Sequence, residues 1–245
     1  MLMQIRLTVA YDGGAFYGFQ RQREEPTVQS VLEAALSELN RAPTEVRGAG
    51  RTDSGVHARE QVVCFFPSLA IPEERWPFAV NQRLPAELVV RKADEVSDHF
   101  DPVRQAKWKH YRYVIHQDRV PSPFTRRFVW HVRDHLDLCE MRKAGKRMLG
   151  AQDFAAFQVA GRPVRHTVRN LRLLWVRRKG KYLLIDLVAD GFLYKMARSI
   201  VGTLVEVGRG AILETDVQRI LREKDRSRAG PTAPAQGLFL MRVHY

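Results

Sequence analysis

The feature that most limits the possible folds is a repeated switch, in both halves of the chain, between apolar residues at a period of two and apolar residues at helical spacing. In the first half, Thr27 is the expected cap of a helix that Pro43 ends. Strands are predicted at 5–12, 44–49, 61–66 and 87–96, and helices at 27–42 and 73–83. A chain that mixes strands and helices in this way folds into α+β or α/β layers.

The second half has the same mixture of elements without repeating the sequence. Lys179 and Gly180 are the expected turn of a hairpin. A helix over 192–208 has one apolar stripe and Gly208 as its stop. The other expected elements are strands at 109–116, 128–132, 170–178, 181–189 and 237–245, and helices at 137–149 and 214–224.

Charge is distributed unevenly along the chain, which has 40 Lys and Arg against 27 Asp and Glu. Residues 1–105 contain 12 basic and 15 acidic side chains, whereas residues 106–245 contain 28 and 12. The sign changes near Pro102, so we predict two domains, 1–105 and 106–245. The basic half indicates binding to nucleic acid. The alternative is a charged thermostable surface or an arginine-rich codon usage, since 31 of the 40 basic residues are Arg.

Several classes of protein are excluded by composition. With 45% apolar residues, the chain is neither disordered nor fibrous. It contains no apolar run of membrane-spanning length and no signal peptide, so we expect a cytoplasmic protein with no membrane partner. Cys64 and Cys139 are the only cysteines, and their spacing suggests neither a disulfide scaffold nor a zinc ribbon.

The loop GAGRTDSGVHA at 48–58 is the richest in chemistry-bearing side chains. It is not a dinucleotide fingerprint, because the third glycine is replaced by Asp53. A glycine-permitted turn can keep the Asp53 carboxylate ionised with Arg51 as its partner. The alternative is that Asp53 only bonds the amides of its own turn. No serine- or cysteine-centred signature occurs, which makes Asp53 the best nucleophile candidate.

Two other segments add candidates. Arg198 flanks the apolar stripe of its helix. This position allows two alternatives: an arginine that reaches a buried carboxylate, or a solvated arginine on the helix face. In KWKHYRYVIH, Tyr111 and Tyr113 share one strand face, suited to stacking on bases or to core packing. A dense basic run follows: Arg162, Arg165, Arg169, Arg172, Arg177, Arg178, Lys179 and Lys181.

Metal binding is not supported by the sequence. His131 and His135 have i, i+4 spacing, but they lie in a predicted strand region and no third ligand follows. We therefore expect no metal.

Seven segments spread over nearly the whole chain are distinctive: YDGGAFYGFQRQ at 11–22, VQSVLEAAL at 28–36, GRTDSGVHA at 50–58, HYRYVI at 110–115, RNL at 169–171, FLYKMARSIVGTLVEVG at 192–208 and GLFL at 237–240. In these segments and in their order, the chain resembles the bacterial tRNA pseudouridine synthase A family. The GRTD-[AS]-GVHA block is highly specific to that family. Ser54 stands where many members have Ala, which leaves the expected role of Asp53 undisturbed.

The resemblance implies an isomerase that converts uridine to pseudouridine in the anticodon arm of tRNA, at positions 38, 39 and 40, without a cofactor or metal. It implies an α+β pseudouridine synthase fold, in which two similar halves share a long mixed, mostly antiparallel sheet with a central basic cleft. It also implies a homodimer that binds tRNA across both subunits.

The resemblance assigns a role to each candidate residue. Asp53 is the catalytic aspartate, and Tyr111 stacks on the target uracil. Arg198 is the partner of the aspartate, Arg51 helps to extrude the base, and Leu238 is an apolar wall. The remaining residues, expected near the RNA, are Arg165 and Arg169.

Two other functional classes compete with this interpretation. A non-catalytic RNA-binding module explains the charge and the aromatic residues, but not the GRTDSGVHA loop, and HYRYVI lacks the RRM signature. A nuclease or glycosidase using carboxylates would need a second acid near a comparable loop, and none is evident.

Overall fold

The computed structural model describes residues 3–159 and 166–245. The chain forms two compact units: unit 1 is Met1–Lys107 together with Phe239–Tyr245, and unit 2 is Trp108–Leu238. Each unit is described by itself. Within the described ranges, no helix is long and apolar enough to cross a membrane.

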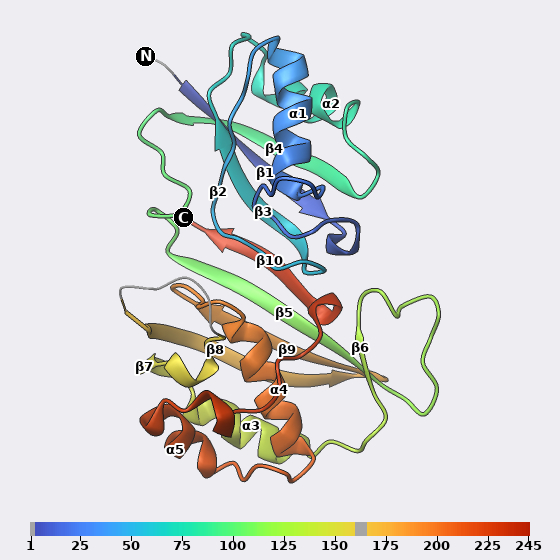
Figure 1. Cartoon of the computed structure of the whole chain (residues 1–245), viewed down its shortest axis with the longest axis vertical. Helices are drawn as coiled ribbons and strands as arrows, with labels where there is room; N and C mark the ends of the chain where they lie inside the picture. Colours follow the sequence, from blue (N-terminus) through green and yellow to red (C-terminus); the bar gives the residue numbers. More distant parts are fainter. Residues whose placement is uncertain (1–2, 160–165) are drawn as a thin grey trace. The chain divides into compact units, whose positions relative to one another are not determined.

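Unit 1 is a sheet packed with two helices (Figure 1). Its strands are β1 (Met3–Tyr11), β2 (Arg47–Gly48), β3 (His57–Phe65), β4 (Leu88–Ser97) and β10 (Leu238–His244); its helices are α1 (Val28–Asn40) and α2 (Trp76–Asn81), with 3-10 turns at Gly13–Ala15 and Glu73–Arg75. The strand order is β4-β1-β3-β10. β1 is antiparallel to β3 and β4, β2 is antiparallel to β3, and β10 is parallel to β3.

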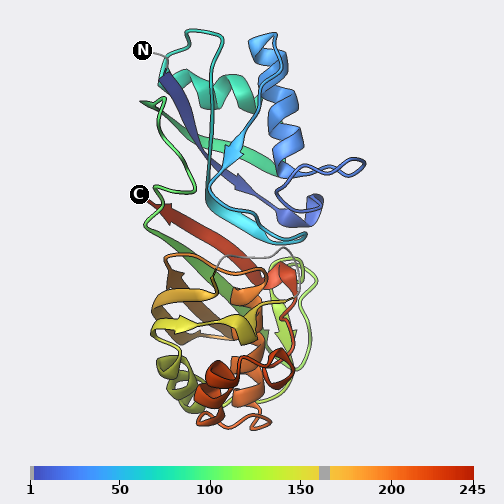
Figure 2. The same cartoon turned by 60° about the vertical axis from the view of Figure 1, so that its left-hand side comes forward.

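The core of unit 1 follows from the alternation predicted for its first strand. Leu7 of β1 is buried completely, as are Leu32 and Leu36 of α1 and Trp76 of α2. Figure 2 shows α1 in blue running alongside these strands. The Thr27 cap of α1 is confirmed: Thr27 and Ser30 form a capping box in which each side chain accepts the other's backbone N–H.

Two boundaries differ from the expectation. β3 begins at His57 rather than at residue 61, because His57 and Ala58 pair with Phe239 and Leu240 of β10. This same pairing makes Phe239–Tyr245 part of unit 1 instead of the second half. The division after Lys107 lies two residues from the expected boundary at 105.

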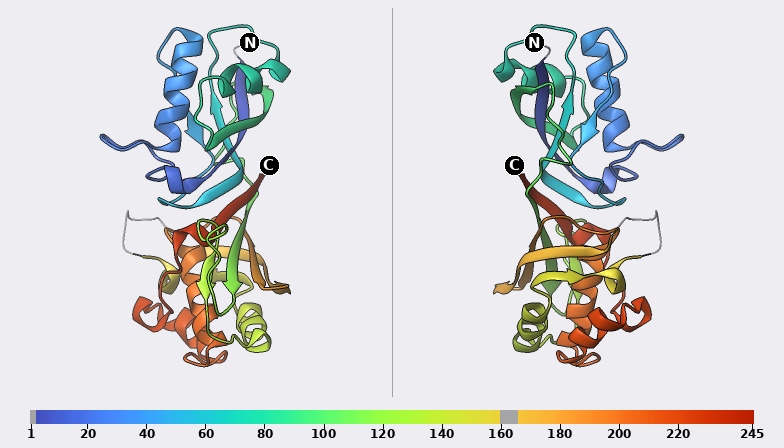
Figure 3. Two further views of the ribbon diagram at one scale, coloured as in Figure 1. Left: turned by 90° about the vertical axis from the view of Figure 1, so that its right-hand side faces the viewer. Right: turned by 90° about the vertical axis from the view of Figure 1, so that its left-hand side faces the viewer.

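Unit 2 is an antiparallel sheet in the order β5-β9-β8-β7, with β6 parallel to β5. Its strands are β5 (Trp108–Gln117), β6 (Trp130–Val132), β7 (Gly150–Asp153), β8 (Val168–Lys179) and β9 (Tyr182–Ala189); its helices are α3 (Leu138–Arg147), α4 (Met196–Gly208) and α5 (Asp216–Glu223), with 3-10 turns at Ala155–Phe157, Arg226–Arg228 and Ala235–Gly237. Figure 3 shows the three helices grouped together. The predicted hairpin turn is confirmed, with Gly180 at φ +59°.

α4 is shorter than its apolar stripe predicted. Lys195 has a left-handed backbone (φ 59°), which is incompatible with the interior of an α-helix, so the helix begins at Met196. Residues 190–195 therefore form a turn between β9 and α4. Gly191 and Phe192 of this turn become part of the candidate site.

Candidate active site

The Asp53 loop connects β2 to β3 in unit 1. Asp53 is half-buried, and its backbone carbonyl accepts the N–H of Val56 at 3.1 Å. Gly55 lies between them at φ +78°, a conformation that favours glycine. Arg51 precedes this turn and is exposed. The loop therefore presents a carboxylate and a guanidinium on one short, tightly turned segment.

A second segment braces this loop. Phe19 N–H donates to the Thr52 carbonyl at 3.1 Å, and the hydroxyls of Tyr11 and Thr52 are 2.8 Å apart. Burial raises the pKa of Tyr11 to about 12. A Cβ at Gly13 would lie 2.0 Å from the Val56 carbonyl oxygen, so only glycine allows this approach. The contacts on both sides of Asp53 hold its backbone in place.

His57, which follows the Asp53 turn, connects the loop to the bracing segment. Its ring is almost completely buried and stacks on Phe239, with ring centroids 4.7 Å apart. Nδ1 lies 3.0 Å from the backbone nitrogen of Gly13 and 3.1 Å from Oδ1 of Asp12. An unprotonated Nδ1 accepts from Gly13 and a protonated one donates to Asp12, so the ring secures the bracing segment in either state.

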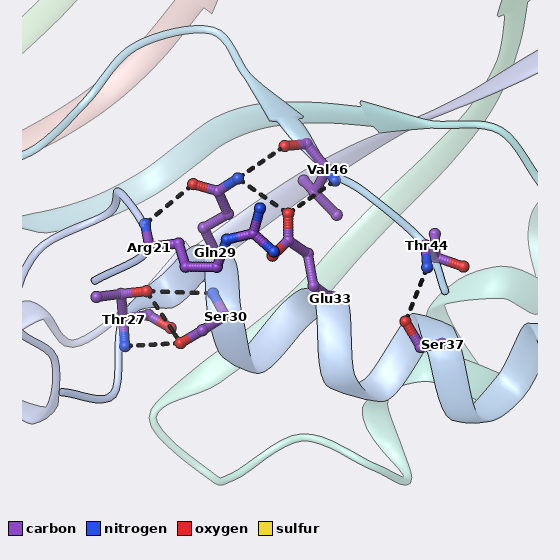
Figure 4. A network of polar contacts seen from close by, with 8 residues as sticks. All are labelled: Arg21, Thr27, Gln29, Ser30, Glu33, Ser37, Thr44 and Val46. Atoms are coloured by element: carbon purple, nitrogen blue, oxygen red, sulfur yellow. Dashed lines mark hydrogen bonds and ion pairs between the residues drawn. The ribbon is translucent and has the colours of Figure 1, made fainter. Parts of the chain in front are cut away.

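A polar network on α1 continues this support (Figure 4). The Gln29 side-chain amide donates to Glu33 Oε1 at 2.9 Å and to the Val46 carbonyl at 3.2 Å. Val46 N–H donates to the same Glu33 oxygen at 3.1 Å. Arg21 N–H donates to Gln29 Oε1 at 3.0 Å, and the Arg21 guanidinium lies 3.2 Å from Glu33 Oε2. This network joins α1 to Arg21, which follows the bracing segment, and to Val46, which precedes β2.

Tyr111 lies on β5 in unit 2 and is 8% exposed. Phe192, in the turn before α4, packs edge-on against it with ring centroids 4.9 Å apart. Tyr113, two residues further, is fully buried and donates its hydroxyl to the Pro234 carbonyl at 2.7 Å. Burial also raises the pKa of Tyr113. Both tyrosines are buried, but Tyr113 is enclosed completely whereas Tyr111 keeps a small exposed fraction.

Arg112, between these tyrosines, and His110, just before Tyr111, point to the other face of β5. His110 Nε2 lies 2.7 Å from Asp186 Oδ1, and Arg112 Nε donates to the same oxygen at 2.8 Å. Burial alone raises the pKa of the Asp186 carboxyl, but the hydrogen bonds from His110 and Arg112 outweigh it and hold the pKa below its usual value. The interleaving seen in the sequence thus combines an aromatic face with a separate ion-paired face.

Arg198 is half-buried on α4, as expected for a residue beside the apolar stripe of the helix. Its Nε donates to the Ala233 carbonyl at 2.7 Å, and Ala233 N–H donates back to the Arg198 carbonyl at 3.1 Å. A Cβ at Gly202 would lie 1.7 Å from the Pro231 carbonyl oxygen. The segment before β10 is therefore packed tightly along α4 and clamped by Arg198.

The remaining predicted site residues also belong to unit 2. Leu238 is 5% exposed at the start of β10. Arg169 is half-buried on β8 and donates from Nη1 to the carbonyls of Val168 (2.6 Å) and His166 (3.1 Å). Arg165 lies outside the described residues. Each unit thus holds part of the predicted set, with Arg51 and Asp53 in unit 1 and Tyr111, Arg169, Arg198 and Leu238 in unit 2.

Sequence reasoning did not single out two further residues. His57 is within the GRTDSGVHA block, but its contacts with Asp12 and Gly13 join segments 44 residues apart. Lys109 shares the strand face of Tyr111, and period-two counting could have shown this. In 3–159 and 166–245, no three His, Cys, Asp or Glu residues are grouped so that they could hold a metal ion.

A family profile described as tRNA pseudouridine synthase matches residues 7–103 and 144–245. The chain belongs to the tRNA pseudouridine synthase family. It is similar to the tRNA pseudouridine synthase A of Moorella thermoacetica, with 46% identity over 243 residues, which cover 98% of this chain and 99% of the relative. The synthases A of Bacillus licheniformis and Acetivibrio thermocellus are 41% and 38% identical, each covering at least 99% of both chains.

This membership confirms the predicted family, the mixed α+β fold and an isomerase of the tRNA pseudouridine synthase type. The individual residue roles, the basic cleft, the homodimer and the cytoplasmic location stay predictions.

Proposed function

We propose that this chain isomerises uridine to pseudouridine in the anticodon arm of tRNA, with Asp53 as the essential carboxylate. The observation that carries the proposal is the braced turn around Asp53. Tyr11, Gly13 and Phe19 contact the turn through hydrogen bonds or close backbone packing. An aspartate that merely closes its own turn does not require a second segment to hold it from both sides.

The target uridine must first leave its stack, which costs a few kcal/mol. Stacking on Tyr111 offsets part of that cost, since a stacked base is worth about 1–3 kcal/mol. Phe192 fixes the Tyr111 ring edge-on, so the ring is already oriented before RNA binds. Exposed Arg51 contributes a cation that assists extrusion from the loop side.

The isomerisation breaks the N1–C1′ bond and forms C5–C1′. The C5 proton is lost, and N1 gains a proton, so atoms and charge balance. Ionised Asp53 either attacks covalently or stabilises positive charge on the sugar. Both roles require that the detached uracil turns without competing water. Leu238 supplies an apolar wall and Arg198 compensates the carboxylate.

The partners follow from charge and family. The basic residues of 106–245 suit the tRNA phosphates. Arg165 and Arg169 contact the RNA in this proposal. The chain acts as a cytoplasmic homodimer, and the reaction uses no cofactor or metal.

The test is tritium release from a tRNA transcript labelled at C5 of uridine, measured together with tRNA binding. We expect release by the intact protein and a loss of at least about 10³-fold in Asp53→Asn, with binding retained. Asp98→Asn, an exposed aspartate of unit 1, is the matched control and should keep full activity. Binding without release by the intact protein would overturn the proposal in favour of an RNA-binding module.

The role of Arg198 needs its own variant, because Arg198 also clamps Ala233. We expect Arg198→Ala to lose stability and turnover together, by about 1–3 kcal/mol, less than for a fully buried pair because Asp53 and Arg198 are both half-buried. Thermal unfolding and tritium release measure the two effects. Unchanged turnover rejects the pairing with Asp53.

A further inference from the structure

Lys109 and Arg169 lie on the same face of the unit 2 sheet as Tyr111. Lys109 is two residues before Tyr111 on β5, so both side chains point to one face. Lys109 pairs with Ala189 of β9, which pairs with Leu171 of β8. Arg169 is two residues before Leu171 and therefore shares this face. The register brings both cations to the end of the sheet that carries the proposed stacking tyrosine.

The turn after β9 connects these three side chains. A Cβ at Gly191 would lie 3.4 Å from Arg169 Nε, so the arginine side chain runs over Gly191. The next residue, Phe192, packs on Tyr111. Gly191 and Phe192 thus place the Arg169 side chain and the Tyr111 ring against one short turn.

Two cationic side chains influence each other at this end of the sheet. Burial, and secondly the nearby Arg169 charge, lower the pKa of Lys109 to about 8. Among the residues that the structure describes, the titratable groups at this end of the sheet include His166, whose Nδ1 is 3.2 Å from Arg169 Nη1. They also include Tyr111 and exposed Asp190, which accepts the Asn170 N–H at 3.0 Å. An added anion stabilises a half-buried ammonium that lies near a guanidinium.

We propose that Lys109 and Arg169 form a phosphate-binding subsite for the RNA backbone next to the nucleotide that stacks on Tyr111. This inference rests on the proposed function, because it assigns the phosphate to the same RNA. Lys109 is a positioning residue: it holds the backbone while Tyr111 holds the base. The phosphate accepts hydrogen bonds from the ammonium and the guanidinium, and its negative charge keeps Lys109 protonated.

Protonation of Lys109 then couples tRNA binding to pH. Below pH 8 Lys109 is already protonated in the free protein, so affinity changes little with pH. As pH rises through about 8 the free protein loses this proton, while the complex keeps it. Affinity should therefore fall above pH 8, by up to tenfold per pH unit for one coupled proton.

The test measures tRNA binding in the Asp53→Asn background, where substrate is not consumed, at several salt concentrations and from pH 7 to 9. Lys109→Met should weaken binding about tenfold and reduce the slope of log affinity against log salt by about 0.7–0.9, the value for one phosphate contact. Lys109→Arg should keep the affinity and the salt slope but lose the fall above pH 8. In otherwise intact protein, Lys109→Met should raise KM more than it lowers kcat.

Lys143→Met is the matched control, because it removes the same charge from an exposed lysine that is paired with Glu140 on α3. It should change neither the salt slope nor the pH profile. An unaltered slope and pH profile in Lys109→Met would overturn the subsite. Thermal unfolding shows whether Lys109→Met folds. If it does not fold, Lys109→Arg becomes the test: the subsite is overturned if tRNA binding by Lys109→Arg has the same pH profile as binding by the intact protein. These binding results do not depend on product formation, so they separate this proposal from the proposed reaction.

Discussion

Two carboxylates that are almost completely buried are held in different ways in the two units. In unit 1, Glu33 accepts from an amide side chain and a backbone N–H, and lies beside one cation, Arg21. In unit 2, Asp186 is surrounded by His110, Arg112 and Arg177, the last at 3.3 Å. Glu33 orders chain segments around a loop, whereas Asp186 gathers cations on one face of a sheet.

The difference shows that a count of basic residues overstates the cations directed at RNA. Of the nitrogen-bearing side chains near Tyr111 in the sequence, His110 and Arg112 bind Asp186 on the opposite face, while Lys109 shares the face of Tyr111. Arg177 also lies over the Trp175 ring, 4.8 Å from its centroid. Part of the basic excess of residues 106–245 therefore stabilises unit 2 itself.

The largest expected effect comes from comparing a glycine that braces the Asp53 loop in unit 1 with a glycine on α4 in unit 2. Gly13→Ala forces the bracing segment away from Val56, and we expect about 10²-fold lower turnover, the effect of an approximately 1 Å misplacement of a catalytic group. Gly202→Ala, which overlaps Pro231 in unit 2, should mainly destabilise, by about 3 kcal/mol. Tritium release and chemical unfolding of both variants make the comparison. If the two variants lose the same turnover for each kcal/mol of unfolding free energy that they lose, the bracing segment has no specific role in turnover.

Removing the charge at Asp186 breaks the cation cluster. Asp186→Asn should destabilise by about 2–3 kcal/mol, less than the about 3–5 kcal/mol of a fully buried pair because its partners are partly exposed. Urea unfolding measures this. Arg219→Gln, which breaks an exposed i, i+3 pair on α5, is the control and should change stability by less than about 1 kcal/mol.

The same variant tests a pH dependence. The folded pKa of Asp186 lies below its usual value of about 4. Its stabilising contribution is therefore present above about pH 4 and is lost as pH falls through the folded pKa. The stability difference between intact protein and Asp186→Asn should be constant from pH 7 to 5 and shrink toward pH 3. A difference that grows on acidification would contradict the lowered pKa.

Glu33→Gln tests the unit 1 network. The Gln29 amide and the Val46 N–H lose an ionised acceptor, and we expect about 1–3 kcal/mol of destabilisation. Urea unfolding gives the loss, and limited proteolysis should show faster cleavage near Arg21, whose backbone is held by Gln29. Glu38→Gln on the exposed face of α1 is the control. Proteolysis unchanged from the control would contradict the link to the bracing segment.

The smallest effects concern helix caps. Thr27→Ala removes the capping box of α1, and Asp137→Ala removes the side chain that accepts from Cys139 and Glu140 at the start of α3. Each should cost about 1 kcal/mol of unfolding free energy. High salt should reduce only the Asp137 effect, because only that cap places a charge at the helix dipole. Chemical unfolding at two salt concentrations distinguishes them.

The sequence by itself determined the elements whose signals are local. Period-two and helical spacing located β1, α1 and the β8–β9 hairpin, since burial of one face imposes those periods. The cap at Thr27 and the turn at Gly180 were readable for the same reason. The GRTDSGVHA block indicated the family because its residues are adjacent in the chain.

Only the tertiary structure decided the features that depend on residues far apart in sequence. β3 begins at His57 because a strand from the other end of the chain pairs with it. α4 starts late because Lys195 adopts a left-handed backbone that its apolar pattern does not reveal. Folding of the chain brings together His57 and Gly13, and likewise Arg198 and Ala233. It also brings Asp186 to His110, Arg112 and Arg177. A one-dimensional pattern records which face a side chain occupies, but the partner it meets there is set by packing.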